Sequence, residues 1–420
     1  MKHVFLAGAM MLAGSAAMAD AAPDPAAVLD TYANIAQATY EDALSGAERL
    51  DAAARALVAD PTEANLNAAR QAWIQARVPY QQSEAYRFGN PAVDDWEGLV
   101  NAWPLDEGLI DYVDGSYGDA SDENPYYAAN VVANPELRIG GADIDASTID
   151  AALLEQLQEI DGVESNVSRG YHAIEFLLWG QDLNGTGPGA GSRAATDFDP
   201  DNCTNGNCDR RGAYLTAATA LLITDLQDAV AMWSEGGAAR GDLTDGSTDE
   251  GLAMILTGLG SLSYGELAGE RIQLGLMLHD PEEEHDCFSD NTAWSHYYDQ
   301  VGMQNVYRGR YVRTDGSIVE GPSVADMVSH QDASVASSMN EALQNTQTAM
   351  LAMVTTSQAG KAYDQMLAEG DDAGNRVIQD VVDALKAQTA QIEQVVATLG
   401  LDTLEIEGSD SLDDPDAVFQ

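Results

Sequence analysis

Residues 27–59 read AVLDTYANIAQATYEDALSGAERLDAAARALVA, and this stretch decides the fold class. Apolar side chains recur along it mostly at three- and four-residue intervals, which places them on one face of a helix with 3.6 residues per turn. They are Val28, Tyr32, Ile35, Ala43, Ala47, Leu50, Ala54 and Leu57. The sequence therefore predicts a long amphipathic helix that packs one side against other helices.

Similar periodicity predicts helices along most of the chain. Pro61 ends the first helix, and Thr62 is a good N-cap for a second helix that runs towards Phe88 with a kink at Pro79. The other predicted helices cover residues 150–160, 163–179, 214–233, 251–278, 323–357 and 374–399. Strand patterns are sparse, and residues 279–322 are expected to form a loop. The predicted fold class is all-α.

The order of helices and linkers predicts two helical bundles, at residues 27–180 and 214–400, with long irregular connections. Residues 89–148 form an aromatic-rich insertion in the first bundle. Residues 181–213 form a Gly-rich loop between the bundles. The acidic tail, residues 401–420, is expected to fray.

Two short stretches resemble each other, residues 80–87 (YQQSEAYR) and residues 264–271 (YGELAGER). Each places carboxylates and an arginine late in the second long helix of its bundle. Internal duplication of a bundle would produce this echo, and so would chance. The sequence leaves both explanations open.

The first 19 residues have the features of a secretory signal peptide. Lys2 supplies a positive start, an apolar stretch follows, and Ala17-Met18-Ala19 provides the small residues of a cleavage site. No later stretch approaches the roughly 20 uninterrupted apolar residues of a spanning helix. We therefore expect an exported protein, periplasmic or envelope-associated, with no transmembrane segment.

The chain carries 69 acidic and 19 basic residues, for a formal net charge of −50. Nucleic acids and anionic membranes are bound through Lys and Arg, so this surface excludes both as partners. A cation-binding role and adaptation to a saline medium both remain compatible with the charge.

Cys203 and Cys208 stand close together in the stretch CTNGNC. In an oxidising compartment, they are expected to form a disulfide, which the Asn-Gly turn helps to close. Cys287 is left without a partner.

Residues 170–179, GYHAIEFLLW, lie in the helix predicted at 163–179, and they are apolar on nearly all sides, which is typical of a buried helix. Its polar side chains His172 and Glu175 are three residues apart, and buried polar groups need partners. They could ligate one metal ion, in the reverse order of the Glu-x-x-His pairs of di-iron bundles. The alternative is that they bond only each other and a neighbouring helix.

A second group of polar residues follows in the chain. His285, Asp286 and Asp290 flank the apolar pair Cys287-Phe288 and are candidates for a packed polar site. Residues 282–284, three glutamates, are more typical of a solvated acidic loop.

Carboxylates and arginines with apolar neighbours form a third group. Its members could line a site or form structural ion pairs. They are Glu84, Arg87, Glu266, Glu270 and Arg271.

Motifs of several enzyme classes are absent from the sequence. It has no His-Glu-x-x-His zinc helix, no Gly-x-Ser-x-Gly nucleophile turn, no phosphate-binding loop and no Cys-x-x-Cys-His haem site.

The stretch Gly170-Tyr171-His172-Ala173-Ile174-Glu175 resembles the Gly-x-His-x-x-Glu motif of the imelysin family. Three more stretches resemble the longer form of this family, iron-regulated protein A: residues 83–89 (SEAYRFG), 103–112 (WPLDEGLIDY) and 285–292 (HDCFSDNT). Together they extend the resemblance over residues 27–400.

The resemblance implies two related helical bundles, an envelope location and a link to bacterial iron acquisition, with a functional site at His172 and Glu175. The family is also catalogued among the metallopeptidases. A catalytic zinc takes three protein ligands, whereas this helix supplies one pair. We therefore place a non-catalytic binding protein ahead of a metal-dependent envelope peptidase using His172 and Glu175. A third hypothesis is an interaction protein whose buried polar residues only specify packing.

The expected partner is a metal ion or an iron-bearing ligand, with iron favoured over zinc and with envelope iron-uptake components as protein partners. Fe³⁺ prefers oxygen donors beside an imidazole. The candidate metal ligands are His172, Glu175, Glu84, Glu270 and Asp290. The candidate supporting residues are Arg87, Asp286, Ser289 and Arg271.

Overall fold

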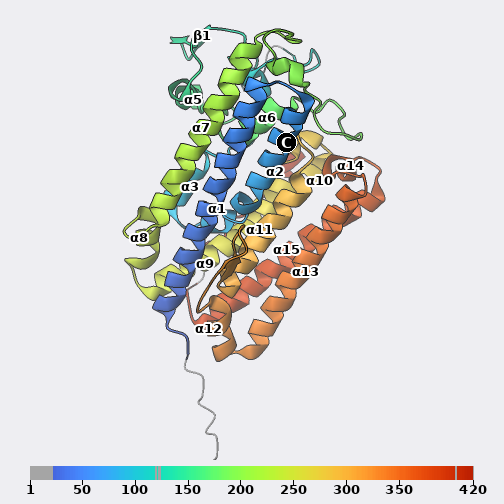
Figure 1. Ribbon diagram of the computed structural model, residues 1–420. Helices are drawn as coiled ribbons and strands as arrows, with labels where there is room; N and C mark the ends of the chain where they lie inside the picture. Colours follow the sequence, from blue (N-terminus) through green and yellow to red (C-terminus); the bar gives the residue numbers. More distant parts are fainter. Residues whose placement is uncertain (1–21, 119–120, 122–123, 403, 420) are drawn as a thin grey trace, which may run out of the picture.

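The computed structural model describes residues 22–118, 121, 124–402 and 404–419 (Figure 1). Helices dominate these residues, and strands are limited to two antiparallel hairpins, β1–β2 and β3–β4. The predicted all-α class is confirmed. The predicted signal peptide, residues 1–19, lies outside the described residues.

The first group of helices is built around α1 (Pro25–Ala59), which packs along α2 (Glu63–Gln81) and α7 (Cys208–Trp233) (Figure 1). Helix α6 (Gly170–Trp179) packs against both α2 and α7. The apolar face of α1 is buried as its periodicity predicts, and Thr62 caps α2. Short elements complete this part: η1 (Glu84–Tyr86), α3 (Pro91–Glu97), α4 (Glu107–Ile110), β1 (Glu136–Ile139), β2 (Ala142–Asp145), α5 (Ala151–Leu157), η2 (Ile160–Gly162), η3 (Ala195–Phe198) and α8 (Ala238–Thr244).

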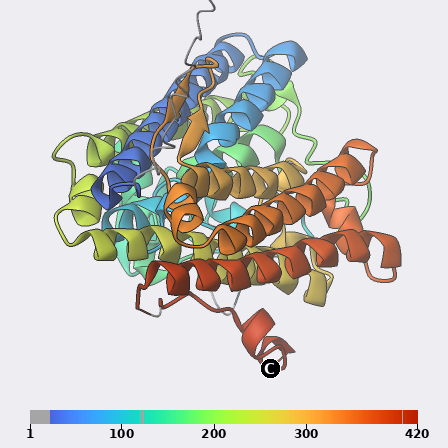
Figure 2. The same ribbon diagram turned by 90° about the horizontal axis from the view of Figure 1, so that it is seen from below.

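The second group contains the long helices α13 (Ala333–Gln358) and α15 (Asp372–Leu399), which pack against each other (Figure 2). Helix α11 (Thr292–Arg308) lies between the groups and contacts both α13 and α2. Its close approach depends on Gly302, because a Cβ there would lie 2.4 Å from the Gln82 carbonyl oxygen. The remaining elements are α9 (Thr248–Ser261), the π-helix η4 (Leu262–Gln273), α10 (Leu274–Leu278), η5 (Pro281–Glu283), β3 (Arg310–Val312), β4 (Ile318–Glu320), α12 (Val324–Gln331), α14 (Tyr363–Leu367), α16 (Asp410–Asp413) and η6 (Ala417–Phe419).

Several predicted boundaries differ from the structure; the second helix, for example, ends at Gln81 rather than near Phe88. Three further differences concern the elements around the site and the second group of helices. Helix α6 begins at Gly170 rather than at residue 163, because Gly170 has φ +83°, outside the right-handed helical region. The predicted helix at 323–357 is two helices, with Asp332 capping α13 between them. The predicted loop at 279–322 contains α11, whose buried side is largely polar and so shows no apolar stripe.

The acidic tail also differs from the prediction of fraying. The Ser411 hydroxyl donates to the Gly269 carbonyl oxygen at 3.0 Å, and the Tyr264 hydroxyl donates to Asp413 at 2.8 Å. Residues 404–419 thus dock on η4 beneath α15 (Figure 2).

Among the described residues, one helical stretch, residues 208–244, has the length and composition of a membrane span. In its most apolar window, 44% of the residues are buried within the molecule. Helix α7, which forms most of it, packs against α1 and α6, as the core helices of globular proteins also do.

Candidate metal centre

Helix α6 positions His172 and Glu175 in the core. The Gly170 backbone passes so close to residue 100 that a Cβ there would lie 2.5 Å from the Val100 carbonyl oxygen. That carbonyl accepts a hydrogen bond from the Tyr171 amide at 2.7 Å, which fixes the start of the helix. His172 is 1% exposed and Glu175 is 0% exposed, so both are buried without access to bulk water.

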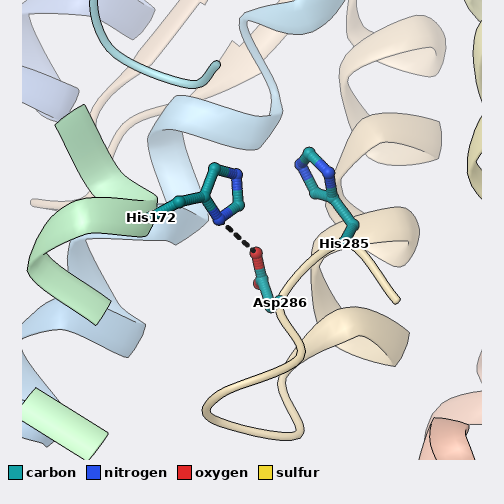
Figure 3. A group of neighbouring side chains, drawn as sticks. All are labelled: His172, His285 and Asp286. Carbon is teal, nitrogen blue, oxygen red and sulfur yellow. Dashed lines mark ion pairs between the residues drawn. The ribbon is translucent and has the colours of Figure 1, made fainter. Parts of the chain in front are cut away.

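The loop between η5 and α11 brings two further donors to His172 (Figure 3). His172, His285 and Asp286, which we call the histidine cluster, each offer a ligand atom, and these atoms lie within 4.8 Å of one another. The two imidazole rings meet edge to face with their centroids 4.7 Å apart. Nδ1 of His172 lies 4.0 Å from Oδ1 of Asp286.

Asp286 is held by bonds to both of its oxygens. Oδ1 accepts a hydrogen bond from Arg77 at 2.8 Å, and Oδ2 accepts from Asn291 at 2.9 Å and from the Ser295 hydroxyl. Arg77 is 1% exposed and also donates to Asn101 at 2.5 Å. The cluster is therefore held by a rigid surrounding shell, which is a common property of metal sites.

Glu175 connects the helix to the loop. Its Oε2 lies 3.2 Å from Nδ1 of His172, and its Oε1 accepts a hydrogen bond from the Ser289 amide at 3.0 Å. Burial, with a further contribution from Asp286, raises the pKa of Glu175 well above its usual range. The Glu175 carboxyl therefore retains its proton at neutral pH unless a positive charge comes close.

The imidazoles at this site are neutral at physiological pH. Burial, followed by the charges of Arg77 and Arg271, lowers the pKa of His172 well below its usual range. Burial and Arg271 have the same effect on the pKa of His285, and burial lowers the pKa of His296 to about 3. Neutral imidazole is the form that binds metals, so protons do not compete for these nitrogens.

A second polar layer lies beside the cluster. Arg271 of η4 bonds Glu84 at 2.8 Å and Glu266 at 2.7 Å, and lies 3.5 Å from Asp299 of α11. The same oxygen of Asp299 is 3.6 Å from Nδ1 of His296. Burial raises the pKa of Asp299 well above its usual range.

A cavity of about 980 Å³ leads towards the cluster, and His285, Trp103 and Arg271 line it. Carboxylates dominate the rest of its lining, so we call it the acidic cavity. They are Glu97, Asp106, Glu107, Glu159, Glu164, Asp182, Glu266, Glu270, Glu282 and Glu283. Such a lining concentrates cations.

The predicted site residues fall into four places. Glu175, Asp286 and Ser289 lie at the histidine cluster with His172, and Glu84 and Arg271 lie in the adjacent polar layer. Glu270 is exposed and lines the acidic cavity. Arg87 pairs with Asp94 at 2.8 Å at the cavity wall, and Asp290 belongs to a separate group with Glu284 and Asp364.

Sequence reasoning missed Arg77, His296 and Asp299 as residues of this site. Arg77 resembles any surface arginine of an amphipathic helix, although it follows Trp73 by one turn and lies over that ring. His296 and Asp299 lie on α11, within the region predicted to be a loop. Their spacing of three residues repeats that of His172 and Glu175, and this was the one available signal.

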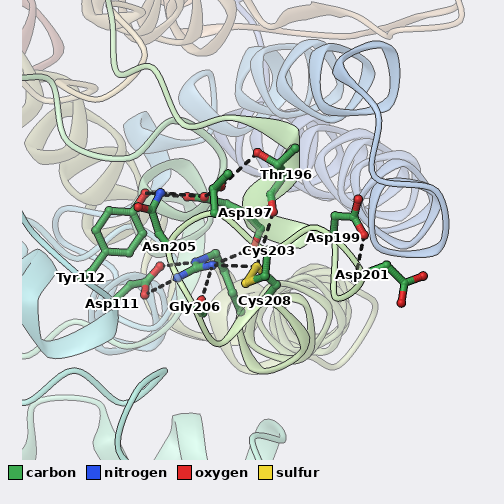
Figure 4. The surroundings of a disulfide bond; sticks show 12 residues. Asp111, Tyr112, Thr196, Asp197, Asp199, Asp201, Cys203, Asn205, Gly206 and Cys208 are labelled. Carbon is green, nitrogen blue, oxygen red and sulfur yellow. Dashed lines mark hydrogen bonds and ion pairs between the residues drawn. A yellow bond between two sulfur atoms is a disulfide. The ribbon is translucent and has the colours of Figure 1, made fainter.

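Cys203 and Cys208 form a disulfide at the start of α7 (Figure 4). Beside it, Asp111 accepts hydrogen bonds from Arg211 at 2.5 Å and from Arg193 at 2.9 Å. These buried ion pairs tie the Gly-rich loop to the first group of helices. Cys287 is a free, buried cysteine.

The residues of the histidine cluster fit a metal ion. Nε2 of His172 and both ring nitrogens of His285 have no hydrogen-bond partner in the described part of the chain, although they are buried. A buried polar atom without a partner costs about 1–3 kcal/mol. A metal bound to one nitrogen of each ring would remove much of this cost.

Comparison with known proteins places the chain in a family. The imelysin family model, which carries the label peptidase M75, matches residues 36–392. Iron-regulated protein A of Synechococcus elongatus is 28% identical over 287 residues, which cover 66% of this chain and 62% of that relative.

A crystal structure from Parabacteroides distasonis, described as an iron-regulated protein A precursor, has a TM-score of 0.64 with 17% identity. The structural match covers 91% of this chain and 97% of the Parabacteroides chain, which shows that the two proteins share a fold. Because the family match extends over most of the sequence, this chain belongs to the imelysin family.

Proposed function

We propose that this protein is an exported iron-binding protein of bacterial iron acquisition, which holds a metal ion at the histidine cluster. One observation carries the proposal: two neutral imidazoles and a carboxylate offer donor atoms within 4.8 Å. Two histidines and one carboxylate are the ligand set of many non-haem Fe(II) sites. The name of the Synechococcus relative, iron-regulated protein A, supports the choice of iron.

The charge balance of the site favours a cation. Glu175 and Asp299 have raised pKa values because they are buried with other carboxylates nearby. A divalent ion near Glu175 would stabilise its ionised form, so that metal binding releases a proton. The acidic cavity would supply the entry path for this ion.

Access to the site favours binding over peptide hydrolysis. A metallopeptidase must bring the scissile bond to its metal and keep one coordination position open. His172, Glu175 and Asp286 are at most 1% exposed, and only His285 of the histidine cluster lines the acidic cavity. An ion can pass to this depth, whereas a peptide chain would need the loop at 284–291 to move.

Metal content tests the proposal. The purified protein is exposed to iron and to zinc, freed of unbound metal and measured by mass spectrometry. We expect near-stoichiometric iron in the wild type and in His330→Ala, an exposed-histidine control, and its loss in His285→Ala and in the double variant His172→Ala/Glu175→Ala. If neither metal is retained, the proposal fails and the cluster is structural. Zinc retention together with His172-dependent peptide cleavage would favour the peptidase.

A further inference from the structure

We propose that a second cation site, for a hard divalent ion such as Ca²⁺, is formed by Glu284, Asp290 and Asp364, which we call the carboxylate cluster. This inference goes beyond the proposed function, because it concerns other residues and a different ligand chemistry. Each of the three residues offers one carboxylate oxygen, and these oxygens lie within 4.8 Å of one another.

Two of the three residues are buried, Asp290 is half-buried, and the cluster lacks compensating charge. Glu284 and Asp364 are each 1% exposed. Oε1 of Glu284, Oδ1 of Asp290 and both carboxylate oxygens of Asp364 have no hydrogen-bond partner among the residues that the structure describes. None of the three forms an ion pair within that part of the chain. Three clustered acids without a counter-charge must either stay protonated or hold a cation.

The donor atoms select the class of ion. An all-oxygen site without imidazole or thiolate favours Ca²⁺, Mg²⁺ or Mn²⁺ over Zn²⁺ or Cu²⁺. Opposite ligands of a bound Ca²⁺ lie about 4.8 Å apart, so oxygens within this distance of one another can bind one ion. Mg²⁺ dehydrates reluctantly and is seldom held by a cage of protein carboxylates alone, so the cluster suits Ca²⁺ better, with water completing its coordination.

The position of the cluster suggests what the ion does. Glu284 follows η5, Asp290 precedes α11 and Asp364 is the second residue of α14. A shared ion would tie the loop at 284–291 to α14. Glu284 directly precedes His285 and Asp286, so the ion would fix the loop that supplies two members of the histidine cluster.

The experiment is calorimetric titration of the full chain with CaCl₂ at about 0.15 M salt, where exposed charges are screened. We expect one calcium site in the wild type and in Glu369→Gln, an exposed control near α14. Asp364→Asn should weaken this site at least about tenfold, because one ligand charge is lost. Glu284→Gln should weaken calcium binding to a similar extent. Agreement of the two variants means that the result does not depend on the folding of one of them.

Iron content separates this inference from the proposed function. His172→Ala should retain calcium binding, and Asp364→Asn should retain iron. Calcium binding of equal strength in the wild type and Asp364→Asn would overturn the proposal, because the ion would then be held by surface charge alone. Absence of any calcium site in the wild type would overturn it as well.

Discussion

Replacement of Arg77 by methionine tests the electrostatics of the histidine cluster. Arg77 is 1% exposed and bonds Asp286, which is 0% exposed, at 2.8 Å. Removing one partner of a buried ion pair costs about 3–5 kcal/mol. Asn291 and the Ser295 hydroxyl still bond Asp286, so we expect a loss near 3 kcal/mol for Arg77→Met.

Urea denaturation of the metal-free protein measures this loss. The control is Arg138→Met, which removes an ion pair whose side chains are 71% and 86% exposed and should change the free energy of unfolding by less than about 1 kcal/mol. Adding Fe²⁺ without oxygen should stabilise Arg77→Met more than the wild type, because the ion replaces the lost positive charge near Asp286. Equal losses in the two variants, or a smaller effect of Fe²⁺ on Arg77→Met, would refute this reasoning.

Three further results are expected. Gly170→Ala should lower the free energy of unfolding by at least about 1–3 kcal/mol and reduce iron content, because its positive φ is strained and its Cβ meets the Val100 carbonyl. Gly316→Ala, also at positive φ but with open space around it, should keep its iron. The pKa of His296 is about 3 in the folded protein, against an ordinary value of 6.5. Between these two pH values the unfolded chain binds a proton at His296 and the folded protein does not, so the free energy of unfolding decreases as the pH falls. His296→Gln should lose less stability than the wild type between pH 6.5 and pH 4 in urea denaturation, and an equal loss would contradict the assigned burial. Glu270→Gln should slow iron uptake in stopped-flow measurements without changing the final iron content, and a lower content would make Glu270 a ligand after all.

The long helices were predictable because their burial is one-sided. Helices α1 and α15 bury apolar stripes that match their periodicity, so their positions follow from the sequence. Helix α11 could not be found in this way, because it buries Ser295, His296, Asp299, Gln300 and Gln304. Its stability comes from contacts with α2 and α13, which are remote in sequence.

The same reason limited what could be predicted of the site. His172 and Glu175 stand out because they are polar residues in an apolar helix. Their partners Arg77 and Asp286 are separated by 209 positions in the chain, and only the packing of α2 against the loop before α11 brings them together. Glu270 and Asp290 are carboxylates near the motifs that suggested a metal site. The fold places Glu270 in the wall of the acidic cavity and Asp290 in the carboxylate cluster.

The most direct test of the central claim is anomalous diffraction at the iron absorption edge from crystals of the iron-loaded protein. The account predicts an anomalous peak at bonding distance from His172, His285 and Asp286, and no peak there in crystals of His285→Ala. Iron found only among the glutamates of the acidic cavity, or no ordered iron at all, would contradict it.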